Sequence, residues 1–451
     1  MAGRPDLLND NLWRIAMRLS PPGILGMLMI SINSLIDSIY LGNLVGADAF
    51  AGVSLLFPLT LVISAATGLI AAGSGSVLSR AIGAGNVEVQ RKVIPNLLAL
   101  ALIFSVVLMA AGLLFTDGLV ALMGGQGEVL ETGRTYFGAY VYSIFFSIYG
   151  LSANGLIRAE GKVKEAMNYT MISVVLNLLT TPLFITVFSM GVAGAAWSSV
   201  LSMGIYSLLT SWYFIGGRSS FNTGRFGIRI ERAIIKDVIS VGTSSLSMQL
   251  SNVVRQFFLF RLVAAYGTNH DIAFFGAAFR LFTFVSVPAM GLLQPLQPVI
   301  GINFGAGKWQ RCGDTIKIFR LGAIGLTLLL LAPIIIFPEA VVSIMIPGEK
   351  LLEGELHNLR LIFLAMPWLP IASTGIIFFQ ATGKGWLAIT MPVARQLILF
   401  VPLVLLLSLK AGIDGIYYAL AIENMAYAIV VQLLLRKELK KLSPMTGLSA
   451  G

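Results

Sequence analysis

Charged side chains are scarce in this chain. Only 12% of its 451 residues are Asp, Glu, Lys or Arg, whereas 57% are hydrophobic. A soluble globular protein carries about 25% charged residues, which cover much of its surface. The shortage of charge therefore excludes a soluble protein and indicates one that lies in a lipid bilayer.

Cysteine and histidine are scarcer still. The single cysteine, Cys312, excludes an intramolecular disulfide. The two histidines, His270 and His357, fall in predicted outer loops and form no metal-ligand spacing. An enzyme would need a clustered set of acids, bases or metal ligands. We therefore expect a protein that is not an enzyme and that has no metal site and no cofactor.

Long apolar runs are what the chain has instead. Between Arg18 and Asp48 the only charged residue is Asp37, and about 20 apolar residues cross a bilayer core about 30 Å thick. The runs do not alternate every second residue, which favours helices over barrel strands. We predict an all-α polytopic fold with twelve helices, near residues 17–42, 50–79, 94–116, 135–157, 166–188, 192–215, 237–265, 272–303, 318–338, 359–380, 386–408 and 413–435.

Lys and Arg are concentrated in every second predicted loop. Most of the 31 basic residues lie in the N-terminal segment and in every second loop, whereas the other loops hold only Arg134, Lys350, Arg360 and Lys410. By the positive-inside rule this bias places both termini in the cytoplasm, in a multi-pass protein of the cytoplasmic membrane. The basic residues are spread over separate loops without interleaved aromatic residues, so we expect no binding of nucleic acid.

Two loops recur at one spacing. "IGAGNVEVQRK" and "FGAGKWQRCGD" place Gly85 and Gly307 222 residues apart, and "RAEGK" and "QATGK" repeat that spacing. "GVAG" at 191–194 and "GIDG" at 412–415 repeat at 221. The sequence therefore predicts a duplication: a six-helix lobe at 1–216, a cytoplasmic linker at 217–235 and a second six-helix lobe at 236–451 with a short basic tail. Parallel repeats of this kind are typical of transporters that work by alternating access.

Several segments carry a resemblance to a known family. They are the first helix with "SINSLIDSIYLG", "FPL" at 57–59, "GSGSVLSRAIGAGN" at 73–86, "NLLTTPLFI" at 177–185, "GVAGAAWSS" at 191–199 and "RQLILFVPL" at 395–403. Together with the duplication, nearly the whole chain resembles the multidrug and toxic compound extrusion (MATE) family. The resemblance implies a V-shaped twelve-helix exporter that is driven by inward Na⁺ or H⁺ and moves amphipathic, often cationic compounds outward.

The resemblance also implies a cation or proton site in the first lobe, on Asp37, Asn154, Asn177 and Ser199. Many relatives have an aspartate just before the proline of the fifth helix, but here Thr181 precedes Pro182. One negative charge is then left where such relatives have two. We expect Thr181, with Asn177 and Ser199, to stabilise the ionised Asp37 or to offer oxygens to Na⁺. Pro182 frees a backbone carbonyl one turn earlier, which either bends the helix or binds a cation.

Asp37 is the residue that we expect to couple ion movement to transport. An ionisable group at bilayer depth is costly, and the apolar cores of the first six helices contain no basic residue to pair with it. Asn33 lies one turn earlier on the same face, can hydrogen-bond with it, and is also expected to line the substrate cavity. Tyr136 and Tyr140, at the outer start of the fourth predicted helix, either line the substrate cavity or pack in the core.

Polar residues also interrupt the helices of the second lobe. We predict that these residues line the substrate cavity: Gln249, Asn252, Arg255, Gln256 and Arg280. Alternatively, the arginines, including Arg395, form ion pairs with Glu423. If Arg255 and Arg280 are unpaired, they favour an anionic or zwitterionic substrate.

The sequence thus predicts a monomeric secondary exporter in the lipid bilayer that couples inward H⁺ or Na⁺ movement to efflux of small amphipathic organic compounds. The alternative is a flippase or exporter of a lipid-linked or anionic amphipathic substrate.

Overall fold

The computed structural model describes residues 6–46, 52–53, 56–122, 127–224, 226–343 and 353–442. Over these ranges the chain is helical and has no strand. Residues 50, 51, 54 and 55 of the second predicted span, Lys350 in an outer loop, and residues 443–451 lie outside the described residues. The basic residues of the predicted tail, which end at Lys441, are described.

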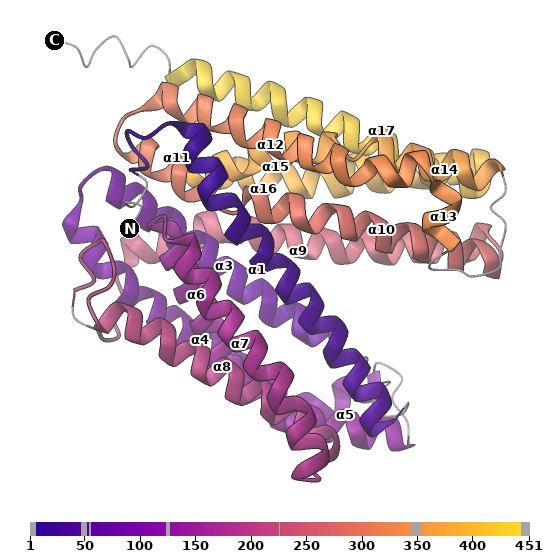
Figure 1. Cartoon of the computed structure of the whole chain (residues 1–451), viewed down its shortest axis with the longest axis horizontal. Coiled ribbons are helices and arrows are strands. Elements are labelled where there is room, and N and C mark those ends of the chain that lie inside the picture. The colour runs from indigo at the N-terminus through magenta and orange to yellow at the C-terminus, as the bar shows by residue number, and fades with distance from the viewer. Residues whose placement is uncertain are drawn as a thin grey trace. The chain divides into compact units, whose positions relative to one another are not determined.

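Every predicted span falls on a helical segment of the described chain (Figure 1). The first half holds α1 (Leu12–Tyr40), the π-helical η1 (Leu41–Val45), α3 (Phe57–Gly83), α4 (Val87–Leu122), α5 (Gly127–Tyr140), α6 (Ser143–Ala159), α7 (Val163–Pro182), the π-helical η2 (Leu183–Val187) and α8 (Gly191–Ile215). The second half holds α9 (Arg232–Tyr266), α10 (Asn269–Leu293), α11 (Leu296–Gly305), α12 (Trp309–Ile336), α13 (Pro338–Ser343), α14 (Glu353–Leu364), α15 (Trp368–Ala381), α16 (Gly385–Ala394), the π-helical η3 (Arg395–Phe400) and α17 (Val401–Leu442). The predicted all-α polytopic fold is confirmed.

Several spans are broken helices. The helix pair α5 and α6 bends by 53° at a short break. Helix α17 contains a kink at Ala411 and Gly412, so one continuous assignment joins the last two predicted spans. By length and composition, nine helical stretches of the described chain, or ten if the bent pair counts as one span, can cross a membrane. The protein is therefore a multi-pass membrane protein.

The repeated glycines share one backbone conformation. Gly85 and Gly307 have φ values of 64° and 72°, and Gly161 and Gly383 have values of 86° and 74°. Gly191 and Gly412 also lie in the left-handed region. After each of the first four, the next residue's N–H bonds to a carbonyl five residues back, for example Asn86 to Ala81 and Lys308 to Asn303, both at 2.9 Å. The repeats thus end corresponding helices with the same glycine cap.

Contacts divide the chain into two compact units. The start of α1 belongs to the unit that contains most of the second half, and the start of α9 belongs to the other unit; we call these the exchanged starts. The N-terminal unit comprises Leu25–Leu246, and the C-terminal unit comprises Met1–Ile24 with Ser247–Gly451. Both boundaries fall inside a helix, α1 and α9, and Ile24 and Leu246 are again 222 residues apart. The predicted lobes, which follow the repeat along the sequence, remain a prediction.

Close backbone contacts hold each exchanged start. A Cβ atom at Gly23 of α1 would lie 2.3 Å from the carbonyl oxygen of Gly291 in α10. A Cβ atom at Gly242 of α9 would lie 2.1 Å from the carbonyl oxygen of Leu69 in α3. Only glycine permits helices to approach this closely, so glycine packing fixes the first turns of α1 and α9 in their units.

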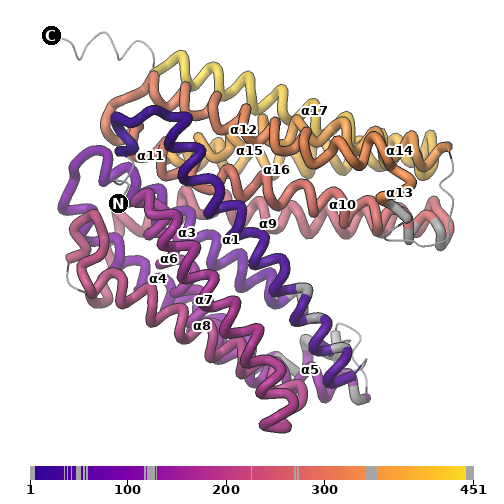
Figure 2. Tube along the Cα trace, viewed as in Figure 1, coloured from indigo at the N-terminus to yellow at the C-terminus, as the bar shows by residue number. Residues whose placement is uncertain are grey.

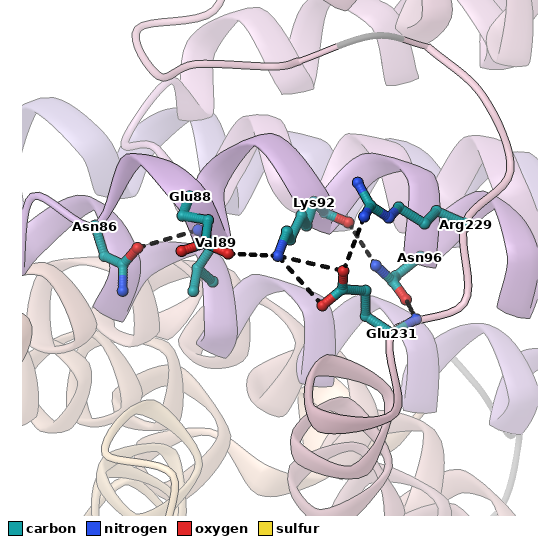
Figure 3. Close-up of polar contacts among 7 residues, drawn as sticks. All are labelled: Asn86, Glu88, Val89, Lys92, Asn96, Arg229 and Glu231. Atoms are coloured by element: carbon teal, nitrogen blue, oxygen red, sulfur yellow. Dashed lines mark hydrogen bonds and ion pairs between the residues drawn. The ribbon is translucent and has the colours of Figure 1, made fainter.

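The segment that leads into α9 is tied to α4 by a polar cluster within the N-terminal unit (Figure 3). Lys92 Nζ lies 2.6 Å from Glu88 Oε1 and 3.2 Å from Glu231 Oε1, and Arg229 contacts the same Glu231 oxygen at 3.3 Å. Asn96 Oδ1 accepts a hydrogen bond from the Glu231 backbone N–H at 2.7 Å. Since Glu231 directly precedes α9, this cluster determines where the helix begins.

Glu160, at the end of α6, fixes the start of the same linker. Its carboxylate accepts hydrogen bonds from the Tyr213 hydroxyl and from the Ser220 hydroxyl and N–H. Burial raises the pKa of Glu160 although these donors oppose the shift. The predicted linker is therefore attached at both ends to the N-terminal unit.

The N-terminal segment is attached to the C-terminal unit in a corresponding way. Lys308 Nζ donates to Leu8 O at 3.0 Å and to Asn9 Oδ1 at 2.8 Å, and Arg311 donates to Leu7 O. In the tube view of Figure 2, residues leading into α1 lie beside α11 and the start of α12. Each exchanged helix thus enters its unit from a segment held by that unit.

We predict that Gly85→Ala and Gly307→Ala each destabilise the protein by about 1 kcal/mol, because alanine is strained in the left-handed region. Neither site has an atom within 4 Å of an added Cβ, so steric clash does not contribute. Gly313→Ala is the matched control, since Gly313 lies in α12, also has open space, and is not among the left-handed glycines. Thermal unfolding of the detergent-purified variants measures the effect, and equal destabilisation by the control would contradict it.

Candidate functional site

Asp37 lies on the last turn of α1, where the α-helix passes into η1. Its carboxylate is half-buried, and Asn33 Nδ2 donates to Asp37 Oδ2 at 3.0 Å. Single π-helical turns are frequent at functional sites because they redirect side chains. The local helix geometry thus presents an acid that the sequence singled out, together with its predicted partner one turn earlier.

Asn177 of α7 makes the second amide contact with this acid. Its amide nitrogen lies 3.1 Å and 3.2 Å from the two Asp37 oxygens, and its amide oxygen accepts from Ser198 Oγ at 3.2 Å. This is the amide orientation in which each polar atom of Asn177 meets a complementary partner. Two carboxamides therefore donate to one carboxylate, which stabilises its ionised form without a basic residue.

Ser198 of α8 connects this amide to the predicted Thr181. The hydroxyl of Ser198 lies 2.7 Å from Thr180 Oγ1 and 2.8 Å from Thr181 Oγ1, and all three side chains are buried. Sequence reasoning selected Ser199 and missed Ser198. The available signal was the spacing of Asn177 and Thr181, four residues apart on one helix face, which requires a polar partner on the facing helix.

Ser199 bonds within its own helix instead: its hydroxyl donates to the Ala195 carbonyl oxygen at 3.2 Å. Tyr136 and Tyr140 stack with ring centroids 5.5 Å apart and planes inclined by 15°. Tyr136 packs against a cluster that contains Leu41 of η1. Hydrogen bonds thus bring together four predicted residues, with Thr181 joined through Ser198: Asn33, Asp37, Asn177 and Thr181.

Asn154 is not part of this group. Its amide nitrogen donates to the carbonyl oxygen of Ala166 at 2.9 Å, which joins α6 to α7. This contact is the helix-joining role that a buried carboxamide often has in membranes. Pro182, predicted to bend its helix, is the last residue of α7, and the π-helical turn η2 begins directly after it.

A cavity of about 320 Å³ lies within the C-terminal unit. Of the five residues of the second lobe predicted to line the substrate cavity, Asn252, Arg255 and Gln256 of α9 line this one, with Arg395 and Gln396 of η3. Gln249 and Arg280 are not among its described lining residues. Arg280 is exposed on α10. Asn252, Arg255 and Gln256 have the i, i+3, i+4 spacing of residues on one helix face. For α10, the sequence alone does not show which face turns inward.

Glu423 of α17 is shared by two arginines at this cavity. Arg255 Nη2 lies 3.0 Å from Glu423 Oε2, and Arg395 Nε is bonded to Glu423 Oε1. Arg395 Nη2 also donates to Asn424 Oδ1 at 2.7 Å. The Glu423 side chain is completely buried. The structure thus contains the ion pairs of the alternative interpretation for Arg255 and Arg395.

No group of three or more His, Cys, Asp or Glu side chains that could hold a metal ion occurs among the residues with described positions. Cys312 is buried, with its sulfur 3.7 Å from the carbonyl oxygen of Ile300.

Comparison with known proteins identifies the family. The sequence model of the MatE family matches residues 22–183 and 245–406, one match in each half of the chain. The chain belongs to the MatE family. It is therefore a membrane transporter of the multidrug and toxic compound extrusion class, and the two matches agree with the predicted duplication.

Full-length relatives include a multidrug export protein MepA and an FAD transporter. The chain is 24% identical to MepA of Staphylococcus haemolyticus, over 93% of this chain and 92% of that protein. It is 25% identical to the FAD transporter of Shewanella oneidensis, over 95% of each chain.

Solved structures of MatE proteins share the fold. A MATE transporter in complex with MaL6 superimposes with a TM-score of 0.90 at 27% identity, covering 97% of this chain and 98% of that one. A MOP superfamily transporter from Pyrococcus furiosus, described as having a binding pocket of reverse polarity, gives a TM-score of 0.88 at 26% identity, covering 98% and 99%.

We predict that Ser198→Ala lowers ion-driven efflux of a cationic dye from proteoliposomes by about fivefold. Loss of one hydrogen bond worth about 1 kcal/mol frees the Asn177 amide that faces Asp37. Ser207→Ala is the matched control in α8, because its hydroxyl donates to the Phe146 carbonyl oxygen at 2.7 Å, outside the Asp37 site. Equal rates for both variants would rule out a role for Ser198 in the site.

Proposed function

We propose that this MatE family transporter is a secondary exporter that couples inward ion movement at Asp37 to outward movement of amphipathic organic compounds. The observation that supports this role is the contact of the Asp37 carboxylate with the amides of Asn33 and Asn177. An acid supported by neutral donors can exist with or without a proton, whereas an acid in a tight ion pair stays ionised. Asp37 is thus suited to bind and release a cation in each transport cycle.

The arrangement favours H⁺ over Na⁺ as the coupling ion. Both amides direct nitrogen toward the carboxylate, and Na⁺ needs oxygen ligands. Binding of Na⁺ would require the Asn177 amide to rotate, so that its oxygen faces the carboxylate and its nitrogen donates to Ser198 Oγ at 3.2 Å. Protonation of Asp37 requires no such rotation.

The export direction and a multidrug substrate range are supported by similarity to MepA along nearly the whole chain. At 24% identity, this similarity supports a class of substrate and not a particular compound. We propose alternating access of the two units, a monomer as the working form, and a cytoplasmic membrane orientation with both termini inside, as the distribution of basic residues indicates.

A second candidate is export or flipping of an anionic amphipathic compound. The observation that favours it is the pair of arginines at the cavity of the C-terminal unit, with a single glutamate between them. Similarity to an FAD transporter also supports this candidate, because the name of that relative gives FAD as the transported compound.

We expect Asp37→Asn to fold and insert but to lose H⁺-driven export, because asparagine keeps the shape of aspartate and cannot exchange a proton. The measurement is dye efflux from proteoliposomes under separately imposed H⁺ and Na⁺ gradients. Asp314→Asn is the control: its exposed pair with Lys317 in α12 contributes little to stability. Export by Asp37→Asn at the wild-type rate under an H⁺ gradient would refute coupling at Asp37.

Membrane orientation is tested by cysteine accessibility. Asn86 and Lys308 are exposed in corresponding loops of the two repeats, so cysteines at both positions should react with a membrane-impermeant maleimide only from inside. Cysteine in place of the exposed Met190, between α7 and α8, should react only from outside. The native Cys312 is 0% exposed and provides a silent background. Labelling of Asn86 and Lys308 variants from opposite sides would contradict the parallel duplication.

A further inference from the structure

The cavity of the C-terminal unit carries an excess positive charge. Arg255 and Arg395 both line it, and Glu423 is the only carboxylate that pairs with either arginine in the described part of the chain. No described lining residue is acidic. One carboxylate balances one guanidinium, so one positive charge remains at the wall. A partly buried charge without a counterion is unfavourable, and a bound anion would compensate it.

Hydrogen-bond donors around the same cavity have spare capacity. Arg255 has five N–H groups, and in the described chain its guanidinium donates to Glu423. Gln396 is 4% exposed, and its amide nitrogen is buried without a hydrogen-bond partner among the described residues. The buried Ser286 hydroxyl oxygen is also without a partner there. Because an unsatisfied buried donor is costly, a ligand that accepts hydrogen bonds fits these groups.

The charged groups are held in place from one side. The Arg255 guanidinium lies over the Phe400 ring, 5.2 Å from its centroid, and Arg395 lies over Tyr427 at 4.6 Å. Stacking and the Glu423 contacts order both side chains before any ligand arrives. Little conformational entropy is then lost when an oxyanion binds to their free edges.

The remaining wall is aromatic and apolar. Phe279 and Phe282 of α10 line the cavity and are stacked with centroids 6.3 Å apart. Met248 and Met290, which adapt to ligand shape, lie on the same lining. A volume of about 320 Å³ is at the lower end of small-molecule sites, so it suits one ring system with one head group.

We infer that this cavity is a binding site for amphipathic organic anions, in which Arg255, Gln396 and Ser286 receive a carboxylate or phosphate group and the Phe279 and Phe282 rings receive an aromatic ring. The inference rests on the proposed export function and names the substrate class of one of its sites. It differs from the cation preference that the family resemblance implies.

Three probes with the same ring and different charge test the inference. They are 2-naphthoate, 2-naphthalenemethanol and 2-naphthylmethylammonium, titrated calorimetrically into the full-length protein in neutral detergent at neutral pH. We expect 2-naphthoate to bind at least about tenfold more tightly than the other two, because hydrogen bonds to an ionised acceptor are roughly twice as strong as those to a neutral one. Equal affinities, or tighter binding of the ammonium probe, would overturn the inference.

Arg255→Gln assigns the binding to the cavity. It leaves the Arg395–Glu423 pair intact and removes the excess charge, so the Kd of 2-naphthoate should rise about tenfold while that of 2-naphthalenemethanol stays constant. Arg280→Gln is the matched control, since it removes an arginine outside the described lining and should leave both values unchanged. Equal effects of the two variants would show non-specific attraction and reject the site.

Gln396→Leu covers the case in which Arg255→Gln does not fold. It keeps every described ion pair and removes the buried amide donor, so it should weaken 2-naphthoate binding severalfold without affecting the neutral probe. No change in the affinity for 2-naphthoate would count against the site. Asp37→Asn should bind 2-naphthoate like wild type. Absence of anion binding with H⁺-driven dye export retained would reject this inference alone, whereas anion binding with export unaffected by Asp37→Asn would reject only the coupling role.

Discussion

A charge inside a lipid-embedded helix bundle must have a partner, and this constraint explains the polar residues of both units. In the N-terminal unit, Asp37 forms no ion pair among the described residues, and carboxamides from two helices donate to it. The C-terminal unit contains two arginines and places one buried glutamate between them. Both solutions stabilise ionised groups, but only the first leaves an acid that can gain a proton without breaking an ion pair.

The helix geometry around both groups departs from a regular α-helix. The π-helical turn η1 follows Asp37, η2 follows Pro182, and η3 begins at Arg395 soon after Pro392 of α16. A π-turn changes the direction in which successive side chains point, and a proline removes one backbone hydrogen bond. The functional side chains are therefore positioned by local defects in helices that are otherwise regular.

Much of the fold could be predicted from the sequence because the bilayer limits the alternatives to helices of nearly fixed length. The loop glycines revealed the repeat, since Gly85 and Gly307 must adopt a conformation that other residues avoid. The exchange of the starts of α1 and α9 was not predictable. It depends on close contacts such as Gly23 with Gly291, which an internal repeat in the sequence does not reveal.

A site residue could be predicted from the sequence where its burial in the bilayer carries a large free-energy cost. An isolated acid such as Asp37 stands out in an apolar helix, as do Asn33 and Asn177 near it. Ser198 and Asn154 show the limit: a serine or asparagine can join helices anywhere, so its neighbours decide its role. The sequence also does not show which face of a helix an arginine occupies. It therefore could not show that Arg255 lines the cavity whereas Arg280 is not among the described lining residues.

The repeat relates the two polar groups to each other. Advancing Asn33 by the 222-residue spacing leads to Arg255, and advancing Asp37 leads to Leu259. The duplicated helix therefore presents corresponding positions in both units, with an amide beside an acid in one and an arginine beside an apolar residue in the other. Because helix packing depends mainly on the apolar face, such polar positions can diverge without a change of fold. One scaffold can thus hold the cation-coupling site that we propose for its first copy and the anion site that we propose for its second.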